Sequence, residues 1–338
     1  MDFSRCRTDL PILLLYDIDP EWSPDIIDNS LQLADNLRNG LISLGHPVEF
    51  ICLDNEALEQ FLEEYDPANY IVFNWCEGIP GKPNSYALVA QILEKNGFVY
   101  TGADALALEF SQDKRQVKKC LADNHIPTPF WEIYETTQSN GWKLFPAIVK
   151  PAMEHCSYGI SPESLVWSPA ELLQRVQFVL DTFHQPALVE EFIDGREFHV
   201  TIIGNGKLRV LPIAEMDFSA FSHPENRLCT YDAKFDPASP AYNLIELKLP
   251  APLSPEQQTA LEAVSLEAYR VTNCRDYARL DIRLRNTTFY VLDINHNADF
   301  SPDTSTALSA EIAGIPYPQL GSLMVNLAAQ RHPGFREL

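Results

Sequence analysis

Three observations predict an α/β protein built from more than one lobe. The 338 residues exceed what a single compact core usually holds. Near the start, short apolar runs alternate with a helical stretch, which is the order of an α/β layer. Late in the chain, two runs of alternating polar and apolar residues flank a short polar turn, a pattern typical of a β-hairpin.

Composition and charge exclude several classes of partner. A formal net charge of -22 argues against nucleic acid and against anionic membranes, because binding a polyanion needs clustered Lys and Arg. No stretch is apolar for the roughly eighteen residues that a membrane helix needs, and none has the form of a signal peptide. The seven cysteines are scattered and form no C-x-x-C pair, so a reduced cytoplasmic location is expected.

The N-terminal part reads as strand 11–17, helix 27–44, strand 48–53 and buried strand 71–75. A loop rich in Gly and Pro follows the last of these strands and begins near Glu77. Ligands of open α/β sheets bind at the carboxyl ends of the strands, so Glu77 is a candidate substrate contact. The alternative is a solvated acid on an ordinary loop. This first domain is expected to end near residue 110.

The predicted hairpin pairs residues 278–284 with residues 288–294. Because side chains alternate along a strand, four polar groups fall on one face, namely Arg279, Asp281, Asp293 and Asn295. Paired strands lie about 4.8 Å apart, so both carboxylates and the amide reach one small cation. Such hard oxygen ligands suit Mg²⁺, which completes its shell with water and phosphate oxygens. The alternative is a solvated face with ordinary surface charges.

Together with Lys150-Pro151 after an apolar run and with Glu190 to Phe198, this hairpin resembles the ATP-grasp superfamily, and in particular the D-alanine–D-alanine ligases. The likeness runs from about residue 113 to the C-terminus and is weaker before residue 72. It implies a Rossmann-like N-terminal lobe over 1–110, then two α+β lobes over 111–186 and 187–338 that clasp ATP.

The resemblance implies phosphate contacts from Lys114, Lys150 and Lys234, and from a loop that includes Ser157. Lys150 follows an apolar strand and precedes a proline that stops it, so its ammonium group is held at a fixed point. For Lys114 the alternative is a lysine on the surface of a helix. The resemblance further implies that adenine and ribose are bound by one segment, whose candidate residues are Glu190, Glu191, Phe192, Ile193 and Glu197.

On the substrate side the chain departs from the ligases it resembles. Cys156 stands where the family usually has serine, and Phe235 stands where tyrosine is common, so two hydroxyl groups are absent. A hydroxyl at the start of the helix 304–313 is implied to bind a carboxylate, which points to Thr304 or Ser305. A simple helix cap is the alternative role for that hydroxyl group. The first loop, residues 17–21, also replaces the Gly-Gly and Ser-x-Glu signature of those ligases with acidic residues. These departures predict that the substrates are not a pair of D-alanines.

The resulting hypothesis is an ATP-dependent ligase that joins a small carboxylate to a small amine through an acyl-phosphate and releases ADP and phosphate. The resemblance implies ATP with Mg²⁺, or Mn²⁺, as cofactors, and homodimers are common among similar ligases. Lys234 would contact phosphate, and Arg279 would stabilise the oxyanion formed when the amine attacks. The alternatives are an ATP-grasp kinase or acid–thiol ligase, or a nucleotide-binding protein without catalytic activity.

Overall fold

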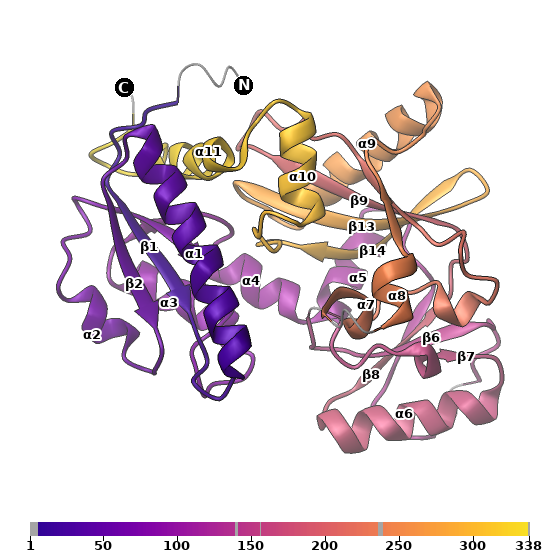
Figure 1. Cartoon of the computed structure of the whole chain (residues 1–338). Coiled ribbons are helices and arrows are strands. Elements are labelled where there is room, and N and C mark those ends of the chain that lie inside the picture. Colours follow the sequence, from indigo (N-terminus) through magenta and orange to yellow (C-terminus); the bar gives the residue numbers. More distant parts are fainter. Residues whose placement is uncertain (1–5, 139–140, 156, 236–238, 337–338) are drawn as a thin grey trace.

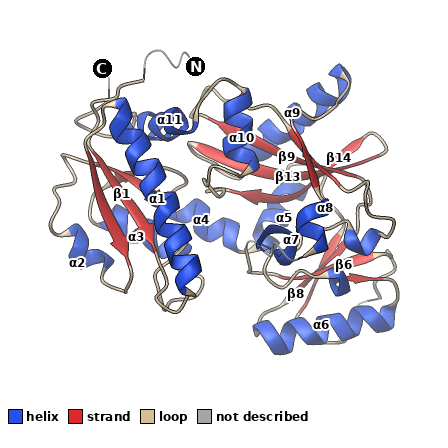
Figure 2. Cartoon of the chain, in the orientation of Figure 1, coloured by secondary structure: helices blue, strands red, loops and turns tan. Residues whose placement is uncertain are grey.

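The structure is a computed structural model that describes residues 6–138, 141–155, 157–235 and 239–336, without the side chains of Lys234 and Phe235. Within these residues the chain folds into three sheets with helices packed against them, as Figures 1 and 2 show. The predicted mixed α/β class is confirmed. The described helices include none that is both long and apolar enough to cross a membrane.

The N-terminal sheet is parallel, with strand order β2-β1-β3-β4. Its strands are β1 (Ile12–Asp17), β2 (Val48–Leu53), β3 (Ile71–Trp75) and β4 (Val99–Tyr100). Every residue of β1 is buried, as expected for a central strand with both faces covered. The helices of this domain are α1 (Pro24–Leu44), α2 (Leu58–Leu62), α3 (Tyr86–Lys95) and α4 (Ala105–Gln112).

The last helix, α11 (Tyr317–Ala329), returns to the N-terminal domain and packs beside α1, as the yellow and indigo ribbons of Figure 1 show. Leu320 and Met324 of α11 share one buried cluster with Leu37 and Leu41 of α1. A Cβ atom at Gly321 would lie 2.8 Å from Leu37 Cδ1, so glycine permits the close approach of the two helices. The C-terminus therefore stabilises the first domain.

The central part begins with α5 (Lys114–Asp123) and contains an antiparallel sheet of order β5-β8-β6-β7. Helix α6 (Pro169–Phe183) buries Leu172 and Val176 against the sheet. The remaining elements are β5 (Trp131–Tyr134), β6 (Ala147–Pro151), η2 (Pro162–Ser164), β7 (Leu165–Val166) and β8 (Ala187–Glu191).

The C-terminal sheet is antiparallel, with order β12-β11-β9-β13-β14 and with β10 paired to β9. The predicted hairpin is confirmed as β13 (Tyr277–Arg285) and β14 (Thr288–Asn295). The other strands are β9 (Arg196–Ile203), β10 (Arg209–Val210), β11 (Ala214–Asp217) and β12 (Glu246–Lys248). Its helices are η3 (Pro224–Asn226), α7 (Tyr231–Phe235), α8 (Pro240–Leu244), α9 (Pro255–Val271) and α10 (Ser305–Ile312).

The two faces of this C-terminal sheet differ in character because side chains alternate along each strand. On one face, Val200 of β9 and Leu280 of β13 pack against Leu261 and Ala268 of α9. The intervening residues of β9, β13 and β14 point to the opposite face, and many of these are charged. Helix α9 therefore fixes the sheet from behind and leaves the other face for polar chemistry.

A buried carboxylate, Asp276, joins three parts of the chain. Its side chain is 0% exposed, and both oxygens accept hydrogen bonds from Arg331, which follows α11, at 2.7 Å each. Asp276 also accepts hydrogen bonds from the backbone N–H of Gly102 at 2.8 Å and from Asn205 Nδ2 at 2.7 Å. One aspartate thus connects the end of the N-terminal domain, the β9–β10 turn and the C-terminal segment.

Candidate active site

A row of charged side chains crosses the polar face of the C-terminal sheet. The register places Asp281 of β13 opposite Asp293 of β14 on one side and opposite His199 of β9 on the other. Two residues before Asp281 on β13, Arg279 lies opposite Asn295 of β14. Two residues after it, Arg283 lies opposite Glu197 of β9. The sheet therefore brings together the four hairpin residues that the sequence singled out, and adds polar groups from β9.

Each of the two aspartates has a positively charged side chain beside it. Arg279 donates to Asp281 at 2.8 and 3.1 Å, and Lys114 of α5 lies 3.0 Å from Asp293. Burial would raise the pKa of Asp293, but Lys114 and Lys150 outweigh it and hold this pKa below its ordinary value. Asn295 Nδ2 donates to Asp281 at 3.2 Å. Two carboxylates and an amide can supply an all-oxygen donor set, which fits Mg²⁺ or Mn²⁺.

A second cluster of charges surrounds Glu190, near the end of β8 in the central sheet. Lys118 and Lys150 approach its carboxylate oxygens at 2.5 and 2.6 Å, off the usual hydrogen-bond direction. Burial opposes ionisation of Glu190, but the two ammonium groups together keep its pKa low. Two cations share one carboxylate, so the cluster keeps a net positive charge that suits an anion. Sequence reasoning passed over Lys118, which looks like any helix lysine there.

The end of β8 and the residues after it hold the other members of the segment that is predicted to bind adenine. Glu191 forms an ion pair with Arg285, and its backbone N–H donates to Phe130 O at 2.9 Å. The Phe192 ring packs against Arg283, with 4.9 Å between the guanidinium carbon and the ring centroid. Ile193 O accepts from Arg283 Nη1 at 2.9 Å. Adenine would therefore bind beside a segment whose carboxylates already pair with arginines, Glu191 with Arg285 and Glu197 with Arg283.

Arg283 and His199 are functional candidates that the sequence analysis did not name. Arg283 Nε donates to Glu197 Oε2 at 2.6 Å, and Arg283 is only 2% exposed. His199 Nδ1 lies 3.1 Å from Ser305 Oγ, and its Nε2 lies 3.7 Å from Asp281 Oδ1. Arg283 could have been found from its even spacing with Arg279 and Asp281, because all three point to one face.

The loop between β6 and η2 approaches the row from the central part of the chain. Ser157 has a positive φ of 62°, and its hydroxyl donates to Cys229 O at 2.7 Å, which ties the loop to the segment before α7. His155 lies beside Tyr86 of α3, with ring centroids 6.3 Å apart. Burial, and then Lys114, lower the pKa of His155 to about 4, so its imidazole is neutral.

Three of the predicted site side chains lie outside the described part of the structure. Cys156 lies outside the described residues, and the side chains of Lys234 and Phe235 in α7 are also outside that part. The two hydroxyls at the start of α10 have different partners. Thr304 is the N-cap and accepts from Ala307 N, as the capping alternative predicts, whereas Ser305 faces His199.

Acidic groups face one another where β1 and β3 end. Asp17 Oδ1 accepts from the backbone N–H of Glu77 at 2.8 Å. Burial raises the pKa of Asp17 to about 6. Glu77 is exposed, but the protein atoms around its carboxyl group displace part of its water. This partial desolvation, with repulsion from Asp17 and Asp299, raises the pKa of Glu77 to about 7. Water screens the charge of Glu77, so Asp17 is the better probe of the cluster.

Asp17→Asn should stabilise the protein at alkaline pH. The amide keeps an acceptor for the Glu77 N–H and removes the buried charge. Because the pKa of Asp17 is higher in the folded protein than in the unfolded chain, the free energy of unfolding of the wild type falls as pH rises from about 4 to about 6. At about 1.4 kcal/mol per pKa unit, we expect a gain of about 3 kcal/mol at pH ~8 and clearly less at pH ~5, measured by urea unfolding. Equal stability of both proteins at pH ~8 would contradict this assignment.

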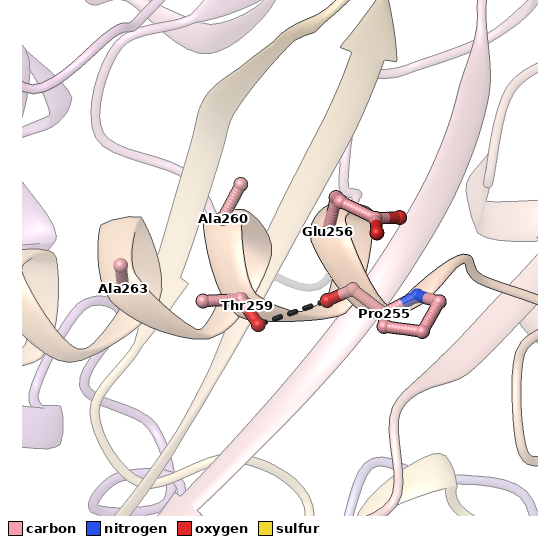
Figure 3. Close-up of a pocket in the computed structure, with 5 residues that line it drawn as sticks. All are labelled: Pro255, Glu256, Thr259, Ala260 and Ala263. Carbon is pink, nitrogen blue, oxygen red and sulfur yellow. Dashed lines mark hydrogen bonds between the residues drawn. The ribbon is translucent and has the colours of Figure 1, made fainter.

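A separate pocket lies on the surface of α9, the helix that covers the opposite face of the C-terminal sheet from these charges (Figure 3). The hydrogen bond drawn there runs from Thr259 Oγ1 to Pro255 O at 2.8 Å, within the helix itself. Among the residues that line it, Glu256 alone is titratable, so it is not the candidate site. Its lining residues are Pro255, Glu256, Thr259, Ala260 and Ala263.

Comparison with known proteins gives a consistent result. Residues 131–326, more than half of the chain, match the family model described as D-ala D-ala ligase C-terminus. An uncharacterized protein of Sinorhizobium fredii is 34% identical over 90% of this chain and 89% of its own. The D-alanine–D-alanine ligase of Pseudothermotoga lettingae is 28% identical over 89% of this chain and 95% of its own.

Solved structures agree on the fold. The crystal structure of D-alanine–D-alanine ligase from Bacillus anthracis complexed with ATP superposes with a TM-score of 0.75. The match covers 96% of this chain and 98% of that one, at 21% sequence identity. The predicted ATP-grasp architecture is thereby confirmed.

Proposed function

Because the chain belongs to the D-alanine–D-alanine ligase family and is an ATP-grasp ligase, we propose that it joins a small carboxylate to an amine through an acyl-phosphate. The observation that carries the proposal is the pairing of Asp281 with Asp293 in register, with Lys114 at 3.0 Å from Asp293. Phosphoryl transfer needs charge neutralisation and positioning more than covalent participation by the protein. Cations and carboxylates held by a rigid sheet meet that need.

Each group has a role that follows from its position. Lys150 and Lys118, held by Glu190, would bind phosphate oxygens, and Lys114 would move from Asp293 to phosphate when nucleotide binds. Mg²⁺ held by Asp281, Asp293 and Asn295 would neutralise phosphate charge. Glu197, fixed by Arg283, would accept from the ribose hydroxyls. We assign Lys234 to phosphate on the resemblance alone.

The amine step is assigned to Arg279. Its guanidinium is fixed on Asp281, and burial, which disfavours the charge, is outweighed by Asp281, so its pKa lies above its ordinary value and it stays charged. A permanent cation at this point would stabilise the oxyanion that forms when the amine attacks the acyl-phosphate. The amine then displaces phosphate, and the nitrogen loses its proton to solvent.

The test is whether release of ADP requires both an acid and an amine. Purified protein with ATP and Mg²⁺ would be screened against amino acids and hydroxy acids, singly and in pairs. Phosphate release that needs a pair supports the proposal. Release with an acid alone and no amine would indicate a kinase, and nucleotide binding without release under any pair would indicate a protein without catalytic activity.

The substrates are proposed to differ from a pair of D-alanines. The acids Asp17 and Glu77 face each other where the two N-terminal strands end, and a cationic or ammonium-bearing substrate would relieve their repulsion. In the same screen, D-alanine alone is expected to give a lower kcat/KM than the best acid and amine pair. The highest kcat/KM for D-alanine dipeptide formation would contradict this.

Lys150→Met is expected to weaken nucleotide binding. A charge-assisted contact to phosphate contributes about 1.5–3 kcal/mol, so the Kd for Mg-ADP should rise about 10- to 150-fold. Lys119→Met is the matched control, because the Lys119 side chain is 70% exposed and pairs with Asp123 across one turn of α5. Isothermal titration calorimetry checks both variants. An unchanged Kd for Lys150→Met would remove Lys150 from the nucleotide site.

We also propose a cytoplasmic location and a homodimer. No described cysteine forms a disulfide, which fits a reducing compartment. Light scattering on the purified protein gives the oligomeric state, and a monomer at micromolar concentration would contradict the proposed homodimer.

A further inference from the structure

We infer that Glu197, His199 and Cys229 form a binding site for a borderline-soft divalent cation such as Zn²⁺. One ligand atom from each residue lies within 4.8 Å of the other two. A carboxylate, an imidazole and a thiolate are a ligand set that zinc accepts, and a thiolate is a poor ligand for Mg²⁺. The cluster therefore differs in chemistry from the all-oxygen set of Asp281, Asp293 and Asn295.

The imidazole of His199 is oriented for this role by Ser305. Its Nδ1 lies 3.1 Å from Ser305 Oγ, so an N–H at Nδ1 can donate to that hydroxyl and leave Nε2 as the ligand atom. Nε2 lies 3.9 Å from Glu197 Oε1. His199 is only 6% exposed, and its place on β9 between two paired strands limits its movement. A hydrogen bond donated by the other ring nitrogen raises the basicity of a metal-bound imidazole.

The carboxylate of Glu197 is fixed in the same way. Arg283 Nε donates to Oε2 at 2.6 Å, which turns Oε1 toward His199. Cys229 completes the set from the segment before α7, where Ser157 Oγ holds its backbone carbonyl at 2.7 Å. A bound metal ion deprotonates a coordinating thiol, so Cys229 would bind as the thiolate. Three protein ligands leave a fourth tetrahedral position open for water.

The site has a consequence for catalysis that rests on the proposed function. Glu197 is assigned there to the ribose hydroxyls, and a metal ion with its bound water at Glu197 Oε1 would occupy the space between this carboxylate and the ribose. Zn²⁺ and nucleotide should therefore exclude each other. Zinc would act as a competitive inhibitor of nucleotide binding, and nucleotide would protect the site from zinc.

Co²⁺ is the probe for the site, since zinc is spectroscopically silent. We expect reduced, metal-free, full-length protein to bind one equivalent of Co²⁺, with a near-ultraviolet thiolate-to-cobalt band and the visible bands of tetrahedral cobalt, all abolished by Zn²⁺. Cys229→Ser should lose the thiolate band. Cys120→Ser, a half-buried cysteine outside the cluster, should keep it. Ser305→Ala should raise the Kd for Zn²⁺ about 10- to 100-fold, measured by competition with a chelator.

Two results would overturn the site: no thiolate band in the wild-type protein, or the same band in Cys229→Ser. The exclusion is tested with adenosine, which has no phosphate to chelate the metal. Adenosine should bind the metal-free protein and bind the zinc-loaded protein at least tenfold more weakly. Equal affinity would refute the exclusion, whereas no binding of adenosine or ADP to the metal-free protein would count against the proposed function instead.

Discussion

An Asp293→Asn variant is expected to lose ligase turnover by about 100-fold or more while it keeps its fold. The change removes one of two anionic groups assigned to Mg²⁺, and removal of one preorganised electrostatic group at a reacting centre typically costs that much in kcat. Asparagine has nearly the same shape and keeps an acceptor for the Ile294 N–H, which Asp293 Oδ1 binds at 3.0 Å.

Turnover would be measured over a range of Mg²⁺ concentrations, with thermal unfolding as the check on folding. Asp303→Asn is the matched control, because this aspartate is exposed in the loop before α10. Its activity should stay close to that of the wild type. Near-normal turnover of Asp293→Asn with an unchanged Mg²⁺ requirement would contradict the metal assignment.

Asp276→Asn is expected to give the largest loss of stability. The change leaves Arg331 without its counter-ion. Breaking a fully buried pair by removing one partner costs about 3–5 kcal/mol, and because the Arg331 side chain is 26% exposed, we expect a loss near the lower end of that range. Asparagine is chosen because residue 276 has a φ of 64°, which asparagine tolerates better than alanine does. Measured differences then report the lost charge rather than backbone strain.

Urea unfolding at neutral pH measures the effect. The control is Asp123→Asn, which removes a surface pair with Lys119 whose side chains are 70% and 61% exposed, and exposed pairs contribute about 0–1 kcal/mol. Equal losses in the two variants would show that Asp276 does not hold the three parts of the chain together.

The hairpin was predictable because its information is local. Alternation from residue 278 to residue 294 sets which side chains share a face, and Arg285-Asn286-Thr287 marks the turn. The structure confirms that Asp281 and Asp293 pair directly. The same alternation includes Arg283, which the sequence analysis left out although it shares their face.

The contribution of β9 could not be predicted in this way. Its pairing with β13 joins residues about eighty positions apart, and no local pattern specifies that His199 lies opposite Asp281. The same limit applies to α11, because its packing against α1 joins the two ends of the chain. Long-range packing also decides that Glu190 is shared by Lys118 and Lys150, since neither lysine is near it in sequence.

The central claim is that ligation proceeds through an acyl-phosphate, and isotope transfer tests it most directly. The acid of the best pair would be labelled with ¹⁸O in its carboxylate, and the phosphate released would be analysed by mass spectrometry. If the carboxylate attacks the γ-phosphate of ATP and the amine then displaces phosphate, one ¹⁸O atom appears in phosphate for each amide formed. Amide formation with unlabelled phosphate would contradict this mechanism.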